Sequence, residues 1–144
     1  MYCMKYLFSL IFFILFFSKN LAAQMLDRYQ WQNRIIIIQS DNTSSKKMEA
    51  QTKLLLHYPQ QLDDRKLILF HSNSSKLQQI FPKKGSHADD HSNIQFKEPY
   101  EIVLIGLDGG VKMRTSDIKE PQEIFDYIDS MPMRSSEIRN KQKN

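Results

Sequence analysis

Two short apolar runs separated by a helical pattern constrain the fold of this chain most strongly. "RIIIIQS" places four consecutive isoleucines at 35–38, and "RKLILFH" places a second apolar run at 65–71. Short β-branched runs bounded by polar residues indicate strands that are buried on both faces. Residues 46–58 carry apolar side chains at helical spacing, and Pro59 ends that pattern. A strand, a helix and a second buried strand predict a right-handed βαβ unit with parallel strands.

A second pattern, "IVLIGLDGGVKMRT", predicts an antiparallel hairpin. Its strands are expected at 102–107 and 111–115, joined at Asp108-Gly109, a pair that favours the positive φ angles of a tight hairpin turn. Lys112 and Arg114 alternate with apolar residues, so the last strand is predicted to be half-buried and near an edge. A final helix is expected in "KEPQEIFDYIDSMPM", with a proline in its first turn and another that stops it.

The remaining segments are polar. Residues 72–98 are rich in Ser, Asn, Lys and His, and they predict a long surface connection with a short helix at 75–81. Residues 135–144 predict a charged C-terminal tail, for which a short helix is the alternative. The element order, β-α-β followed by β-β-α, predicts an α/β thioredoxin-like domain over residues 24–134, with a four-stranded mixed sheet and flanking helices. Pro99 stands directly before the third strand, where thioredoxins carry a cis-proline.

The first 23 residues predict a secretory signal peptide. A lysine near the start precedes an apolar run of 12 residues, from Tyr6 to Phe17, and small residues follow at Ala22 and Ala23. The run is short for a membrane span, which needs about 20 residues. We expect cleavage near Ala23 and a periplasmic or extracellular protein without a stable membrane anchor; the alternative is an uncleaved N-terminal anchor.

Cleavage would change both the charge and the redox chemistry. It removes Lys5, Lys19 and Cys3, so twenty basic side chains become eighteen against sixteen acidic ones. A net charge this small gives no argument for nucleic acid or an anionic membrane as partner. Cys3 is the single cysteine of the chain, so the mature protein has no thiol for disulfide exchange.

The place of a thioredoxin's attacking cysteine, just after the first strand, is held here by "SDNTSS", residues 40–45. A serine hydroxyl cannot cycle through a disulfide. Ser40, Ser44 or Ser45 could act as a nucleophile only with a base in reach, and no G-x-S-x-G segment is present. His57 and His71 lie on or near core elements and are interpreted as structural.

Three groups of side chains are candidates for binding. Basic residues that could hold an anion or an acidic partner are Arg34, Lys112, Arg114 and Arg134. "HADDH" offers imidazole and carboxylate ligands for zinc or copper at His87, Asp89 and His91, although a solvated loop explains the same residues. Met131 and Met133 have the spacing of Cu(I) thioether ligands, but they also fit the apolar stripe of the last helix.

Three segments resemble the domain of unknown function 4174. They are "YQWQNRIIII" (29–38), "VLIGLDGGVKMR" (103–114) and "IDSMPMRSSEIR" (128–139). The matching motif positions are Trp31, Asn33, Arg34, Asp108, Gly109, Gly110, Lys112, Arg114, Met131, Pro132, Met133 and Arg134. Leu107 and Ser135 depart from the family pattern, which often has Lys and Arg there.

The resemblance implies a thioredoxin-like fold related to peroxiredoxins. The family includes small exported bacterial proteins and a domain of sushi-repeat and coiled-coil-containing matrix proteins. The resemblance to it implies no particular activity. Trp31 is expected to close one end of the core, and Arg34 and Arg134 are expected to pair with acidic side chains such as Asp129.

Together these patterns predict an exported, monomeric, non-catalytic binding domain without a cofactor. Its expected partner is an unidentified protein, an envelope component or a small anion. The alternatives are a peroxiredoxin-like oxidoreductase by descent and a metal-binding envelope protein.

Overall fold

The computed structural model describes residues 26, 28–41, 45–73, 76–83, 88–89 and 94–143 of the 144-residue chain. The predicted signal peptide, residues 1–23, lies outside them. The strands of the described part are β1 (Arg34–Ser40), β2 (Leu67–Asn73), β3 (Lys76–Phe81), β4 (Ala88–Asp89), β5 (Tyr100–Ile105) and β6 (Val111–Thr115). Its helices are α3 (Lys46–Leu56), α4 (Pro59–Asp64), α5 (Pro121–Asp129) and α6 (Pro132–Gln142).

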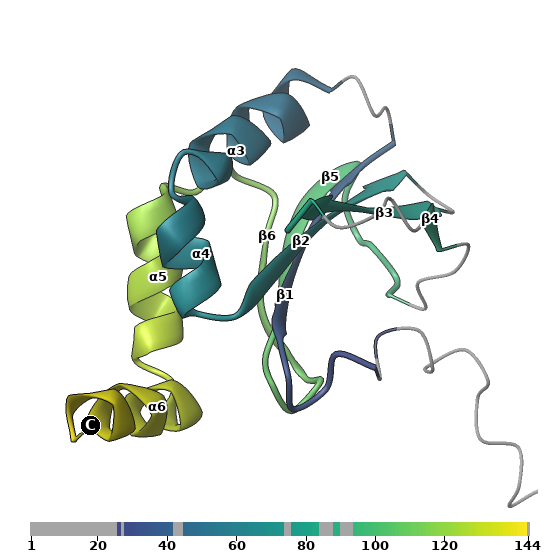
Figure 1. Ribbon diagram of the computed structural model, residues 1–144. Helices are drawn as coiled ribbons and strands as arrows, with labels where there is room; N and C mark the ends of the chain where they lie inside the picture. Colours follow the sequence, from purple (N-terminus) through teal and green to yellow (C-terminus); the bar gives the residue numbers. More distant parts are fainter. Residues whose placement is uncertain are drawn as a thin grey trace, which may run out of the picture.

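The strands form one mixed sheet in the order β4-β3-β2-β1-β5-β6 (Figure 1). β1 pairs in parallel with β2, as the βαβ pattern predicts, and antiparallel with β5 on its other side. The predicted hairpin is also present, because β5 pairs antiparallel with β6, which lies at the edge of the sheet. The sequence-based prediction of an α/β fold with a mixed sheet is therefore confirmed.

The isoleucines of β1 divide the core between the two faces of the sheet. Ile36 and Ile38 pack with Met48 of α3, Phe125 of α5 and other apolar residues of α3, α4 and α5. Figure 1 shows these three helices together on one side of the sheet. Ile35 and Ile37 belong to a second cluster on the opposite face. The consecutive isoleucines thus fill two cores, because successive side chains of a strand point to opposite faces.

The helix expected at 75–81 is wrong: residues 76–81 form β3. This strand pairs antiparallel with β2, and its Leu77 is buried in the second core cluster. Without β3, the backbone groups along the outer edge of β2 would lack a partner, so tertiary pairing outweighs the local pattern of "KLQQIF". Together with the two-residue β4, it expands the predicted four-stranded sheet to six strands.

Pro99 directly precedes β5, and its carbonyl accepts the N–H of Asp41 at 3.1 Å. It therefore lies beside the end of β1. The sequence left the isomer of the Pro99 peptide bond open; in the described part of the chain the cis peptide bond is Phe81–Pro82.

The charged segment 135–144, for which the sequence also allowed a short helix, is part of α6 as far as Gln142. Pro132 does end the helical pattern of α5, and it also occupies the first turn of α6, where a missing N–H costs nothing. Arg134 is the buried residue of α6, so the helix lies against the protein through polar contacts. Within the described ranges, no helix has the length and apolar character to span a membrane.

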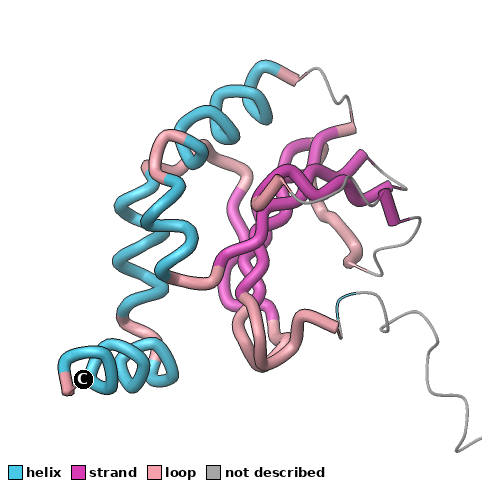
Figure 2. The backbone as a smooth tube through the Cα atoms, viewed as in Figure 1, coloured by secondary structure: helices cyan, strands magenta, loops and turns pink. Residues whose placement is uncertain are grey.

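The sequence suggested that Trp31 closes one end of the core, but the structure shows that it does not. Its side chain is 63% exposed and its φ is 65°, in the left-handed region. The turn that contains it lies beside the β5–β6 turn (Figure 2): Trp31 N–H donates to the carbonyl of Leu107 at 2.6 Å, and Gln30 Nε2 donates to that of Asp108 at 2.9 Å. These backbone contacts hold the indole outward.

Candidate functional site: a pocket beside Arg34

Arg34 is the first residue of β1 and is almost completely buried. Its backbone N–H donates to the carbonyl of Lys66 at 2.9 Å, which fixes the start of the strand against the turn before β2. The residue is 1% exposed. A guanidinium so deeply buried requires hydrogen-bond partners for its N–H groups.

One part of the Arg34 guanidinium has partners and another part has none. Nη1 donates to the carbonyl of Arg65 at 3.0 Å and to Glu137 Oε2 at 3.2 Å. Nε and Nη2 are buried and have no hydrogen-bond partner among the residues that the structure describes. The Nε–H and one Nη2–H of a guanidinium point the same way and form a fork that matches two carboxylate or phosphate oxygens. Arg34 therefore has one unsatisfied edge suited to a bidentate anion.

Arg34 also forms part of the wall of a pocket of about 270 Å³, which we call the Arg34 pocket. The residues that line it are Arg34, Gly106, Leu107, Asp108, Lys112, Met131, Pro132 and Met133. They come from the start of β1, the β5–β6 hairpin and the first turn of α6. Most of these side chains are apolar, so the pocket combines a buried cation with hydrophobic walls.

Lys112 brings a second cation to the pocket. Its Nζ donates to Asp108 Oδ2 at 2.6 Å, across the hairpin turn. The hydrogen bonds from Lys112 and from the N–H of Gly110 lower the pKa of Asp108. Tyr127 of α5 donates its hydroxyl to the Lys112 carbonyl at 2.7 Å and holds the strand in place. The charge of Lys112 is thus paired with that of Asp108, whereas Arg34 has N–H groups without a partner among the described residues.

The first turn of α6 adds a further favourable element. Ser135 N–H makes the first helical hydrogen bond, to the carbonyl of Met131 at 2.9 Å, and no side chain caps the helix. The N–H groups of Met133 and Arg134 come before that bond, so the helix leaves them available. Because the N-terminus of a helix carries partial positive charge, it attracts anions.

A network of ion pairs lies behind the pocket. Arg134 donates to Asp129, Asp64 and Glu137, and all three of its guanidinium nitrogens are used. Counting every ion pair of this network, five basic side chains share three carboxylates; the basic ones are Arg34, Arg65, Lys66, Arg134 and Lys141, and the carboxylates are Asp64, Asp129 and Glu137. The described network therefore carries excess positive charge next to the unsatisfied Arg34 edge.

The structure brings some of the predicted basic residues together and separates one. Arg34 and Lys112 line the pocket, and Arg134 lies behind it with the expected partner Asp129. Arg114 does not join them, because its guanidinium donates to Glu101 Oε1 at 2.9 Å and to the Gln95 carbonyl at 3.1 Å. Arg114 thus stands apart from Lys112 and Arg134, since the buried Glu101 carboxylate binds it.

The metal candidates find no support in the described residues. His87 and His91 lie outside them, and Asp89 belongs to β4. Within the described ranges there is no group of three His, Cys, Asp or Glu side chains that could hold a metal ion. Met131 and Met133 do line one pocket, but they share it with Arg34, whose positive charge opposes Cu(I).

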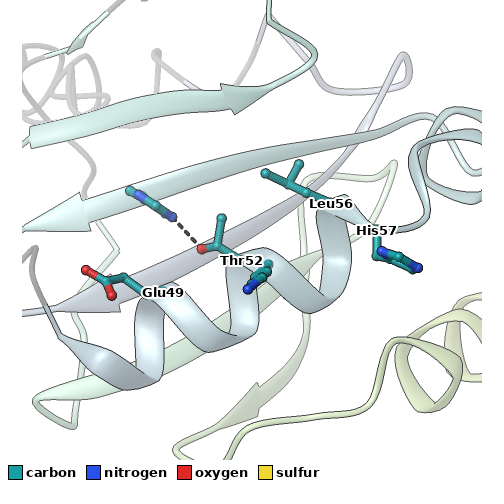
Figure 3. A pocket seen from close by; sticks show the side chains of 6 residues that line it. Glu49, Thr52, Leu56 and His57 are labelled. Carbon is teal, nitrogen blue, oxygen red and sulfur yellow. Dashed lines mark hydrogen bonds between the residues drawn. The ribbon is translucent and has the colours of Figure 1, made fainter.

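A second pocket lies between α3 and β2 and contains the two predicted structural histidines (Figure 3). It is lined by Glu49, Thr52, Lys53, Leu56, His57 and His71. Thr52 Oγ1 lies 2.6 Å from His71 Nε2 and donates to the Met48 carbonyl at 2.7 Å. With its hydroxyl proton given to the Met48 carbonyl, Thr52 Oγ1 accepts a hydrogen bond from His71 in the tautomer that carries the proton on Nε2. Burial lowers the pKa of His71, which favours the neutral imidazole.

The sequence did not show which residues bind Arg34, nor that one edge of its guanidinium lacks a partner. Arg134 and Glu137 are three residues apart on one helix, a spacing that predicts their ion pair. Asp64 and Arg65 gave no comparable signal, because they meet α6 only through the tertiary fold. The apolar pocket residues Gly106 and Leu107 could be recognised only as parts of the hairpin.

No curated protein and no solved structure matches the chain. The family model described as Domain of unknown function (DUF4174) matches residues 25–137. The first two segments that carry the sequence resemblance lie within this range, and the third begins within it. Each segment contributes residues to the Arg34 pocket: the first Arg34, the second the hairpin residues, and the third Met131 to Met133. The match covers most of the chain, which therefore belongs to the DUF4174 family.

Proposed function

We propose that this protein is a non-catalytic binding domain that holds an anionic ligand in the Arg34 pocket. The observation that carries the proposal is the buried guanidinium edge of Arg34, whose Nε and Nη2 lack partners among the described residues. Leaving such a group unsatisfied costs about 1–3 kcal/mol or more. An anion that accepts both N–H groups would remove this cost.

The surrounding charges support the same proposal. Positive charge exceeds negative charge in the ion-pair network that includes Arg34, and the first turn of α6, which has no side-chain cap, lines the same pocket. A pocket of about 270 Å³ is slightly smaller than typical small-molecule sites. Together these features favour a small anion over a large cofactor.

The thioredoxin-like fold is part of this proposal. The order β2-β1-β5-β6, with β1 parallel to β2 and antiparallel to β5, supports it, and so does the position of Pro99 beside Asp41. We also propose export of the protein after cleavage near Ala23. Mass spectrometry of the mature protein would test this: a chain that still begins before Ala23 would contradict it.

Calorimetric titration of the purified protein with small anions tests the binding function. We expect saturable binding that the variant Arg34→Met abolishes. The matched control is Arg139→Met, which removes an exposed guanidinium of α6 bonded to Ser136 and should leave binding unchanged. Equal binding by both variants would place the anion elsewhere and refute the proposal.

A further inference from the structure

We infer that the ligand of the Arg34 pocket is a small monocarboxylate attached to an apolar group, such as a short aliphatic or aromatic acid. This inference rests on the proposed anion-binding function and specifies its chemical class. It follows from three properties of the pocket: the shape of the free Arg34 edge, the small number of other donors, and the apolar walls.

The free edge of Arg34 fits a carboxylate in geometry. Nη1 is occupied by the Arg65 carbonyl and Glu137, so Nε and Nη2 remain, and both belong to the same side of the planar group. Two parallel N–H groups in one plane match the two oxygens of one carboxylate. A lysine at this position could supply charge but not this fork.

Apart from the backbone N–H groups of Met133 and Arg134, donors near the edge are few, which disfavours a tetrahedral dianion. The Lys112 ammonium is bound by Asp108, and Pro132 has no N–H in the first turn of α6. A phosphate would bring oxygens beyond the two that Arg34 can satisfy, and a buried oxygen without a donor is costly. Carboxylates at Asp108 and Glu137 would also repel a second negative charge more than a single one.

The walls then favour an apolar group on the ligand. Leu107 and the two methionines on either side of Pro132 line the pocket. Methionine side chains adapt to irregular apolar shapes. Each buried methylene raises affinity by about fourfold, so the affinity of a carboxylate should rise with the length of its aliphatic chain.

Nuclear magnetic resonance can observe the edge directly, through the Hε–Nε signal of Arg34. The purified protein would be titrated with hexanoate, acetate and inorganic phosphate. We expect hexanoate to shift this signal and to bind at least about tenfold more tightly than either of the other two. Arg34→Lys should weaken hexanoate binding by at least about tenfold, because it keeps the charge but lacks the two-pronged edge.

A second pair of variants avoids disturbing the buried arginine. Met133 is exposed and lies in the first turn of α6, where a carboxylate is tolerated. Met133→Glu places an internal carboxylate at the pocket and should abolish hexanoate binding. Met133→Gln, of the same size but neutral, reports the loss of the apolar wall alone, so hexanoate should bind Met133→Glu at least about tenfold more weakly than Met133→Gln, because only the charge competes for Arg34.

The outcomes separate this inference from the function on which it rests. Phosphate binding at the Arg34 signal as tightly as hexanoate would overturn the carboxylate assignment and leave anion binding intact. Acetate binding as tightly as hexanoate would show that the ligand gains nothing from an apolar group and would overturn that part of the inference. An Arg34 signal that responds to none of the three probes, or that responds equally in Met133→Glu, would overturn both.

Discussion

Arg34 and Glu137 are 103 residues apart in sequence, and their side chains meet at 3.2 Å. This contact joins the first strand of the sheet to the last helix. Glu137 also binds Arg134 at 3.3 Å and Lys66 at 3.6 Å, so one carboxylate connects α6 to β1 and to the turn before β2. The position of α6, and with it one wall of the Arg34 pocket, depends on this residue.

Replacing Glu137 with Gln should therefore destabilise the protein. The amide keeps the shape but loses the charge that compensates the buried Arg34, and we expect a loss of about 1–3 kcal/mol in the free energy of unfolding, measured by urea denaturation. The control Glu123→Gln removes a carboxylate of α5 that pairs with Lys119 on the exposed surface, and it should change little. Equal effects of the two variants would show that Glu137 has no special structural role.

Stability should fall in acid in a way that depends on Asp64. The hydrogen bond from Lys141 lowers the pKa of Asp64 below 3.8, with Arg134 acting in the same direction against the effect of burial. Because the pKa of Asp64 is lower in the folded than in the unfolded protein, its ionised carboxylate stabilises the fold fully at pH values above the unfolded pKa. This contribution is lost as the pH falls through the folded pKa.

Asp64→Asn removes this linkage. Thermal unfolding followed from pH 7 down to pH 3 should show a smaller loss of stability for the variant than for the unchanged protein. A variant that loses stability as steeply as the parent would show that other carboxylates dominate the acid response.

Position 109 requires glycine because its φ is 78°, in the left-handed region. Gly109→Ala should cost about 1–2 kcal/mol in the free energy of unfolding, since a Cβ is disfavoured there. Gly110→Ala is the matched control: it lies in the same turn without a positive φ, and its added Cβ would lie 3.4 Å from Asp108 Oδ1. A control that is destabilised as strongly as Gly109→Ala would exclude backbone conformation as the cause.

Gln51 of α3 is fully buried and holds the loop before α5. Its Nε2 donates to the Lys119 carbonyl at 3.0 Å, and its Oε1 accepts the Lys119 N–H at 2.8 Å. Gln51→Met would leave both backbone groups without this partner, and we expect a loss of about 1–3 kcal/mol by denaturation. Gln122→Met, at an exposed position of α5, should be nearly neutral; a neutral Gln51→Met would instead show that water can replace the amide.

Trp31 is the single tryptophan of the chain and offers a direct test of its exposure. We expect the fluorescence maximum of the folded protein to lie close to that of the unfolded protein, because water surrounds the indole in both. Iodide should quench the folded protein nearly as well as the unfolded one. A blue-shifted, protected indole would contradict the outward orientation.

The sequence predicted those parts of the fold that local periodicity controls. The isoleucine run gave β1, the Asp108-Gly109 pair gave the hairpin, and the helical stripes gave α3 and α5. β3 could not be predicted in the same way, because its strand conformation depends on the exposed edge of β2, which exists only after folding.

The candidate site shows the same division. Arg34, Lys112 and Arg134 could be selected as basic residues, but their different roles could not. Whether an arginine is satisfied depends on carbonyl and carboxylate oxygens contributed by distant segments, as the contact from Arg34 to Glu137 shows. The exclusion of Arg114 likewise depends on its position opposite β5, where Glu101 is buried.

The polar attachment of α6 has a consequence for how the molecule opens. A helix that buries little hydrocarbon contributes little to the heat capacity and urea sensitivity of unfolding. Its release would instead respond to ionic strength, because salt screens charges at partly exposed contacts such as Lys141 with Asp64. The C-terminal helix could thus detach in concentrated salt while the sheet remains intact, uncovering the guanidinium at the start of the first strand.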